Sequence, residues 1–214
     1  MKHSRVNPSF TPGDEFYMTL EPTNRQVDSA NFDALRKLKG KKYTYQAKIE
    51  GQFHEKNCPA EPSLELKEGA QIMFVANHKN GLYVNGSMGF VVWLDDDEIE
   101  VELEDGNTHL LERFKWENNI YIWDAKTRQL GFETVGSLEQ YPIKLAYAVT
   151  VHKSQGLQFD RLVIGNGNFF ANGQLYVALS RCTNLNGLIL KRPLIPKDVM
   201  VDNRVLNFMR NANM

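Results

Sequence analysis

The pattern of apolar and polar positions predicts a strand followed by a helix near the start of the chain. Residues 16–20 are typical of a strand that ends before Pro22, and Thr23 and Asn24 are residue types that begin helices. Apolar residues at helical spacing and a closing glycine predict the helix itself: Val27, Ala30, Ala34, Leu35, Leu38 and Gly40.

The same alternation returns after Tyr141-Pro142. The pattern predicts helices over residues 145–154, 174–181 and 202–210, and strands over residues 161–164 and 187–190. Strands that alternate with helices favour a mainly parallel sheet. We therefore expect an α/β domain built from residues 1–65 and 141–214.

The segment between these parts, residues 66–140, has short strands and tight turns instead. Residues 90–94 and 99–103 predict a hairpin, and residues 120–123 and 130–135 predict another. Several short strands at close spacing suggest a small β-barrel inserted into the α/β domain.

Composition and residue spacing limit the membrane segments, the compartment and the metal sites that we expect. No apolar run approaches the 18 residues of a membrane-spanning helix, and the first residues lack the apolar core of a signal peptide, so we expect no membrane partner. Cys58 and Cys182 are the only cysteines, which makes the cytoplasm the expected compartment. The acidic run at residues 95–98 lacks the spacing of a calcium loop, and we expect no metal site.

Charge is unevenly distributed along the chain, although the net charge is only −1. Residues 141–214 hold nine Lys and Arg against three Asp and Glu, whereas residues 1–140 are net acidic. A basic segment of this kind either faces an anion, such as nucleic acid or nucleotide phosphate, or packs on the acidic part.

Two stretches in the basic segment are candidates for chemistry. Residues 150–156 gather side-chain donors and a glycine, which suits phosphate binding but also an ordinary polar helix end. Arg181 ends an apolar helix, where a guanidinium needs either a carboxylate or a phosphate.

Both stretches resemble helicase motifs. Residues 141–156 are similar to the fifth motif of superfamily 1B DNA helicases, and residues 174–182 to the sixth. The closer match is the Pif-like branch, related to RecD, which residues 66–77 and 83–86 and the set Thr23, Asn24 and Asn31 also resemble. The resemblance runs in order over nearly the whole chain.

The resemblance implies a fold and a set of roles. Residues 1–65 and 141–214 would form the second of two RecA-like motor domains, and residues 66–140 an inserted SH3-like barrel. Arg181 would be the catalytic arginine finger, with Gly156 and Gln158 bordering the same nucleotide. Thr150, His152 and Lys153 would contact single-stranded DNA.

One motif of a complete helicase is missing from the sequence. No Gly-x-x-x-x-Gly-Lys-Ser/Thr loop occurs in these 214 residues, so there is no full site for a nucleoside triphosphate. We expect the chain to be the C-terminal half of an ATP-dependent, 5′-to-3′ DNA helicase, and to be inactive alone. ATP and Mg²⁺ would belong to the complete parent protein, whose N-terminal RecA-like domain would be a partner. The alternatives are a non-catalytic single-stranded nucleic-acid-binding module and a partner of a separate motor subunit.

Overall fold

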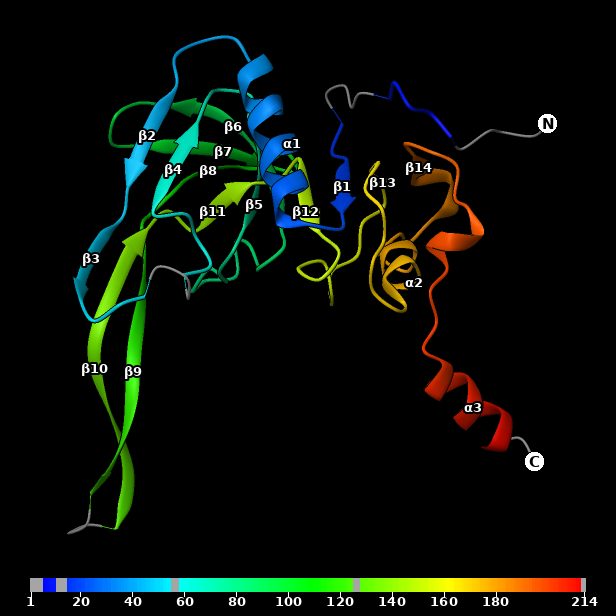
Figure 1. Ribbon diagram of the computed structural model, residues 1–214. Coiled ribbons are helices and arrows are strands. Elements are labelled where there is room, and N and C mark those ends of the chain that lie inside the picture. The colour runs from blue at the N-terminus through cyan, green and yellow to red at the C-terminus, as the bar shows by residue number, and fades with distance from the viewer. Residues whose placement is uncertain (1–5, 11–14, 55–57, 125–127, 213–214) are drawn as a thin grey trace. The chain divides into compact units, whose positions relative to one another are not determined.

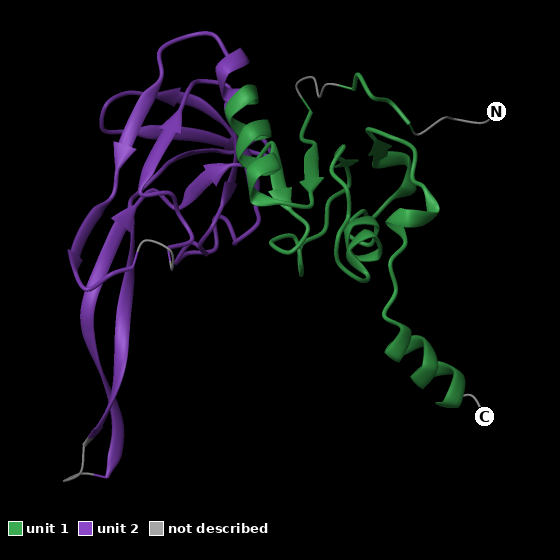
Figure 2. Cartoon of the chain, in the orientation of Figure 1, with its two compact units in different colours: residues 1–34, 146–214 green, residues 35–145 purple. Residues whose placement is uncertain are grey.

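The computed structural model describes residues 6–10, 15–54, 58–124 and 128–212, and the chain divides into two compact units (Figure 2). The first unit comprises residues 1–34 and 146–214, and the second comprises residues 35–145. The chain passes into the second unit within helix α1 (Asn24–Lys37) and leaves it between strands β11 (Ile143–Leu145) and β12 (Ala148–Thr150) (Figure 1).

The first unit contains a parallel sheet with the strand order β12-β1-β13-β14. This confirms the parallel sheet expected from the alternating pattern. Its strands are short, and every residue of β12 and β13 is buried, as is usual for parallel sheets. The elements of this unit are β1 (Met18–Glu21), α1 (Asn24–Lys37), β12 (Ala148–Thr150), β13 (Leu162–Ile164), α2 (Gln174–Leu179), the 3₁₀ turn η2 (Leu185–Gly187), β14 (Leu188–Leu190), the 3₁₀ turn η3 (Pro196–Asp198) and α3 (Asn203–Ala212).

The helix predicted over residues 145–154 is wrong. Residues 143–145 form strand β11, residues 148–150 form β12, and residues 151–156 form turns. A continuous apolar run has no periodicity that separates a buried strand from a buried helix. The pairing of β12 with β1, which matches Ala148 to Thr19, decides in favour of the strand.

The second unit is built from antiparallel strands. Its largest sheet has the order β11-β5-β6-β7-β8, and the predicted β6–β7 hairpin is confirmed, with Ile99 and Val101 fully buried. The strands are β2 (Tyr43–Gln46), β3 (Lys48–Gly51), β4 (Ser63–Leu66), β5 (Gln71–Phe74), β6 (Met88–Leu94), β7 (Ile99–Leu103), β8 (Thr108–Leu110), β9 (Phe114–Asp124), β10 (Gln129–Gln140) and β11 (Ile143–Leu145).

The second unit begins earlier in the chain than the sequence suggested. We expected the boundary at residue 65, but the second unit begins at residue 35, and its strand β3 (Lys48–Gly51) pairs with β10. Strand β2 pairs with β4, and the hydroxyl of buried Tyr45 donates to the carbonyl of Asp95. The side-chain amide of Gln140 donates to the carbonyl of Tyr45 over 2.8 Å, which ties both ends of the unit together.

Strands β9 and β10 form a hairpin that is longer than predicted and extends beyond the other strands of its unit (Figure 1). Its outer part pairs Tyr121 with Phe132 and Trp123 with Leu130, all of them exposed. Cross-strand pairs of large apolar side chains stabilise such a ribbon without a core beneath it.

Candidate functional site

The carboxyl ends of the parallel strands bring together residues that lie far apart in the sequence. Glu21 ends β1, Thr150 ends β12 directly opposite it, and Gly165 follows β13. Ligands of open α/β sheets bind at this edge, where loops leave the sheet. The candidate site is therefore built on this edge of the first unit.

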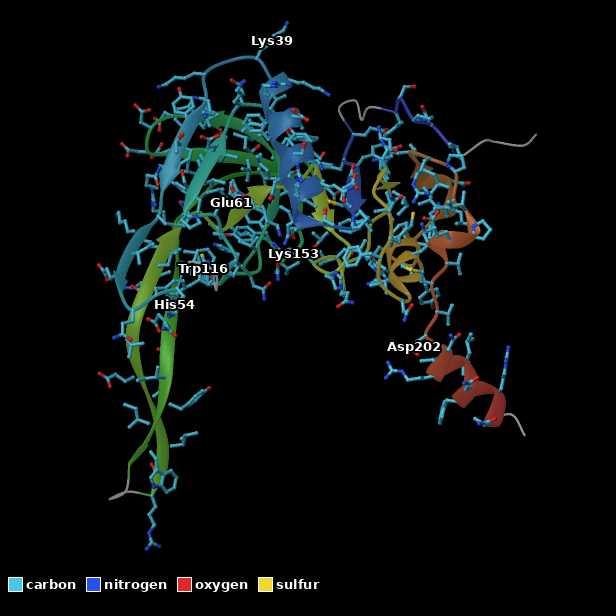
Figure 3. All side chains as sticks on the ribbon, in the orientation of Figure 1. Lys39, His54, Glu61, Trp116, Lys153 and Asp202 are labelled. Atoms are coloured by element: carbon cyan, nitrogen blue, oxygen red, sulfur yellow. The ribbon has the colours of Figure 1, made fainter. Side chains whose placement is uncertain are left out.

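The turn after β12 contains the residues that the resemblance assigns to DNA. Thr150 is 5% exposed, and its hydroxyl oxygen accepts a hydrogen bond from the backbone N–H of Lys153 over 3.2 Å. Fully buried Ser154 donates its hydroxyl to the carbonyl of Val151 over 2.8 Å. These two bonds hold a tight turn in which His152 and Lys153 are exposed (Lys153 is labelled in Figure 3).

Gly156 and Gln158 lie on the segment just before Phe159, which pairs with the backbone next to Arg181. Phe159 forms a bridge with Cys182, and its N–H donates to the carbonyl of Arg181 over 2.8 Å. Gly156 has a φ of +84°, a left-handed conformation that favours glycine. Both Gly156 and Gln158 are exposed, so they are available to a ligand.

Arg181 follows helix α2 and is held by three hydrogen bonds. Its Nε donates to the carbonyl of Val177 over 3.2 Å, one terminal nitrogen donates to the carbonyl of Leu157 over 3.2 Å, and the other donates to the hydroxyl of Ser180 over 3.0 Å. All three acceptors are neutral, and Arg181 makes no ion pair with any residue in the described part of the chain. The guanidinium is thus part-buried, fixed in place and not compensated by a carboxylate.

Glu21 is a residue of this edge that the sequence analysis missed. An added Cβ on Gly165 would lie 1.9 Å from Glu21 Oε1, so the carboxyl group fills the space that this glycine leaves. Its Oε2 is buried and has no hydrogen-bond partner among the described residues. Burial raises the pKa of Glu21, although the backbone amides of Gly167 and Asn166 and the charge of Lys191 act in the opposite direction. The only signal in the sequence was an acidic residue at the end of a buried strand.

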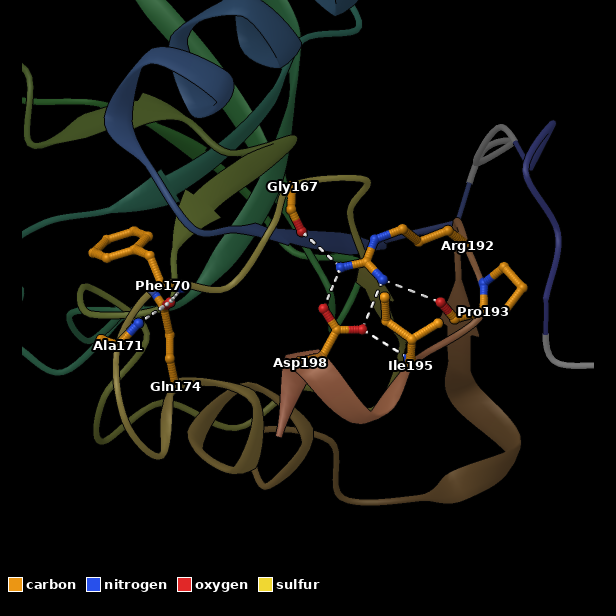
Figure 4. A network of polar contacts seen from close by, with 8 residues as sticks. All are labelled: Gly167, Phe170, Ala171, Gln174, Arg192, Pro193, Ile195 and Asp198. Carbon is orange, nitrogen blue, oxygen red and sulfur yellow. Dashed lines mark hydrogen bonds and ion pairs between the residues drawn. The ribbon is translucent and has the colours of Figure 1, made fainter. Parts of the chain in front are cut away.

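Arg192 and Asp198 form a second pair that the sequence analysis did not identify (Figure 4). Both terminal nitrogens of Arg192 donate to the two oxygens of Asp198 at 2.7 Å, and one also donates to the carbonyl of Gly167. Asp198 also accepts from the N–H of Ile195 over 2.8 Å. The hydrogen bonds from Arg192 lower the pKa of Asp198 to about 2. This geometry fastens the segment after β14 to the loop that holds Glu21.

The side-chain amide of Gln174, the first residue of α2, connects this helix to the loop at residues 170–171 (Figure 4). Its side-chain oxygen accepts from the N–H groups of Phe170 and Ala171, and its nitrogen donates to the carbonyl of Pro22 over 3.5 Å. The start of α2, and with it the helix that leads to Arg181, is therefore tied to the end of β1.

Neither a metal cluster nor a membrane span is found in the described ranges. No group of three or more His, Cys, Asp or Glu side chains is placed to hold a metal ion. No helix there is long and apolar enough to cross a membrane. The acidic run at residues 95–98 forms a local turn, in which Asp95 accepts from the N–H groups of Asp97 and Glu98.

Comparisons with known proteins agree on one group of enzymes. Residues 145–189 match the family model of the UvrD-like helicase C-terminal domain. The ATP-dependent DNA helicase PIF1 of Homo sapiens is 35% identical over 191 residues, covering 85% of this chain and 28% of the relative. The ATP-dependent DNA helicase Pif1 of Campylobacter jejuni is 32% identical over 191 residues, covering 82% of this chain and 42% of the relative.

Solved structures give the same result. Unliganded Pif1 from Bacteroides sp has a TM-score of 0.83 at 33% identity, with 94% of this chain and 46% of that chain covered. Bacteroides Pif1 bound to ssDNA has a TM-score of 0.77 at 32% identity, with 98% and 48% covered. The chain spans less than half the length of both relatives and of the chains in both solved structures.

Proposed function

The chain is similar over most of its length to the C-terminal part of Pif1-like superfamily 1B DNA helicases, and on this premise we propose that it is the C-terminal motor part of an ATP-dependent DNA helicase. The first unit is the second RecA-like domain, and the second unit is an SH3-like insertion. The first RecA-like domain of the same protein binds most of the ATP and its Mg²⁺.

The observation that carries this proposal is the state of Arg181. An arginine finger needs a guanidinium that is oriented in advance and still free to meet the charge on a transferred phosphoryl group. Arg181 is oriented by neutral oxygens of Val177, Leu157 and Ser180, which leave its positive charge uncompensated. Two of its five N–H donors are not used by these bonds.

The other assignments follow from the same edge of the first unit. Gly156 and Gln158 are exposed on the segment that accepts a hydrogen bond from Arg181, which supports a role beside the nucleotide. His152 and Lys153 are exposed on the turn after β12, and this supports a contact with single-stranded DNA. Buried Thr150 supports the turn through its hydroxyl and contributes a polar group beneath the DNA.

The test uses the two-domain protein that contains this chain. Arg181→Ala and Arg181→Lys should each lower ATP turnover by about 10³- to 10⁵-fold, because lysine keeps the charge but lacks the planar fork. Binding of single-stranded DNA should stay near normal. Arg161→Ala is the matched control, since Arg161 lies in the same unit and pairs with Glu15 at the surface.

Melting temperature and turnover are measured on the same preparations. A purely structural arginine would lower the melting temperature while the folded fraction turned over ATP normally, and that result would overturn the catalytic assignment. DNA binding without any ATP turnover in the two-domain protein would instead support a non-catalytic binding module.

A further inference from the structure

Strand β12 is the outer strand of the parallel sheet, and one of its edges has no neighbouring strand among the residues that the structure describes. Toward β1, the carbonyl of Tyr147 accepts from the backbone N–H of Thr19 over 3.0 Å, and the N–H of Val151 donates to the backbone carbonyl of Glu21 over 3.1 Å. Backbone groups alternate in direction along a strand. Ala148 and Thr150 therefore direct their backbone groups to the open edge.

Asn31 of helix α1 occupies that edge at Ala148. Its side-chain nitrogen donates to the carbonyl of Ala148 over 3.2 Å, and its side-chain oxygen accepts from the N–H of Ala148 over 2.9 Å. The amide group of Asn31 thus makes the two hydrogen bonds that a neighbouring strand would make. A side-chain amide has the donor and the acceptor that this double contact needs.

We infer that Asn31 is a positioning residue for the DNA contact at His152 and Lys153, a role that rests on the function proposed above. Ala148 lies two residues before Thr150, whose carbonyl accepts from Ser154 over 3.0 Å and whose hydroxyl accepts from Lys153. The turn therefore begins on a strand that is held by β1 on one edge and by Asn31 on the other. Loss of the Asn31 contact frees the outer edge and lets the turn shift.

The test compares variants of the 214-residue chain in amide hydrogen exchange and in binding of a short oligothymidylate. Asn31→Ala should speed exchange of the Ala148 amide and weaken DNA binding about three- to tenfold, because only part of the free energy of the two lost hydrogen bonds reaches the turn. Alanine is the better helix former, so α1 itself should be no less stable. Ser29→Ala, at an exposed position of the same helix, is the matched control and should change neither quantity.

Asn31→Asp is the second variant, because it keeps the acceptor for the Ala148 N–H and loses the donor. In this variant, the exchange rate of the Ala148 amide should fall between the rates in the wild type and in Asn31→Ala. Ser29→Asp adds the same charge to the same helix and corrects the DNA affinity for charge alone.

A double-mutant cycle separates positioning from general stability. If Asn31 acts through the turn, Asn31→Ala should weaken binding no further in a background where both His152 and Lys153 are already replaced by alanine. Unchanged DNA affinity in Asn31→Ala, with Lys153→Ala clearly weakened, would overturn this inference and leave the proposed function standing. No effect of either His152→Ala or Lys153→Ala would overturn the proposed DNA contact and this inference with it.

Discussion

Replacing Asp198 by asparagine tests the buried ion pair that fastens the segment after β14. Asparagine has nearly the shape of aspartate, so the change removes the charge and leaves the volume. The Asp198 side chain is 6% exposed and that of Arg192 is 22% exposed. In the variant, the Arg192 charge would remain largely buried, and its Nε already has no acceptor among the described residues.

The size of the effect follows from this burial. Removing one partner of a buried ion pair costs about 3–5 kcal/mol. Arg192 retains some contact with water, so we expect the lower end, about 3 kcal/mol. For a chain of this length, that corresponds to a fall in melting temperature of roughly 6–12 °C. Glu15→Gln removes a surface pair with Arg161 and should cost at most about 1 kcal/mol.

The dependence on pH gives a second check. The pKa of Asp198 is lowered to about 2 from an ordinary value of 3.8. A lowered pKa stabilises the fold above the unfolded value, and this stabilisation is lost as the pH falls through the folded value. Urea unfolding followed by circular dichroism should therefore show a constant difference between wild type and Asp198→Asn from pH 8 to about pH 4, which shrinks toward pH 2. Equal stability of the two proteins at pH 7, or a difference undiminished at pH 2, would refute this reasoning.

Three further changes test the sheet edge and the turn. Burial raises the pKa of Glu21, so the stability gained from its neutral form is present below the unfolded pKa of 4.5 and is lost as the pH rises through the higher folded pKa. Glu21→Gln should remove this loss and melt at a higher temperature than the wild type at pH 8. The same dependence of melting temperature on pH in both proteins would contradict the burial argument. Gly165→Ala places a Cβ against the Glu21 carboxyl group and should lower the free energy of unfolding in urea by about 1–3 kcal/mol. Adding Glu21→Ala should restore most of that free energy, and no restoration would show that the strain lies elsewhere. Lys153→Ala should weaken oligothymidylate binding and reduce the salt slope by about 0.7, the change for one phosphate contact, in a fluorescence titration. Asp96→Asn, in the exposed turn of the second unit, should leave that slope unchanged.

Much of the fold could be predicted because it depends on local patterns. Helix α1 follows from its cap residues and apolar spacing, and the β6–β7 hairpin from the alternation of Ile99, Val101 and Leu103 with glutamates. The order of strands and helices also predicted the parallel sheet. Residues 150–156 and Arg181 were identified as candidates from their residue types and their places in the chain.

Other features of the molecule were decided only by the tertiary structure, because they depend on partners that are distant in the sequence. Residues 145–154 could be a strand or a helix until β1 supplied the neighbour that makes β12 a strand. The sequence left Arg181 with either a carboxylate or a phosphate, and the fold surrounds it with neutral oxygens, one of them on Leu157, 24 residues away. Glu21 and Gly165 are separated by 143 intervening positions, and no local pattern relates them. Short-range spacing specifies the elements that have a clear periodicity, whereas the pairing of a fully buried strand and the contacts of a buried charged group are specified only when the whole chain has packed around them.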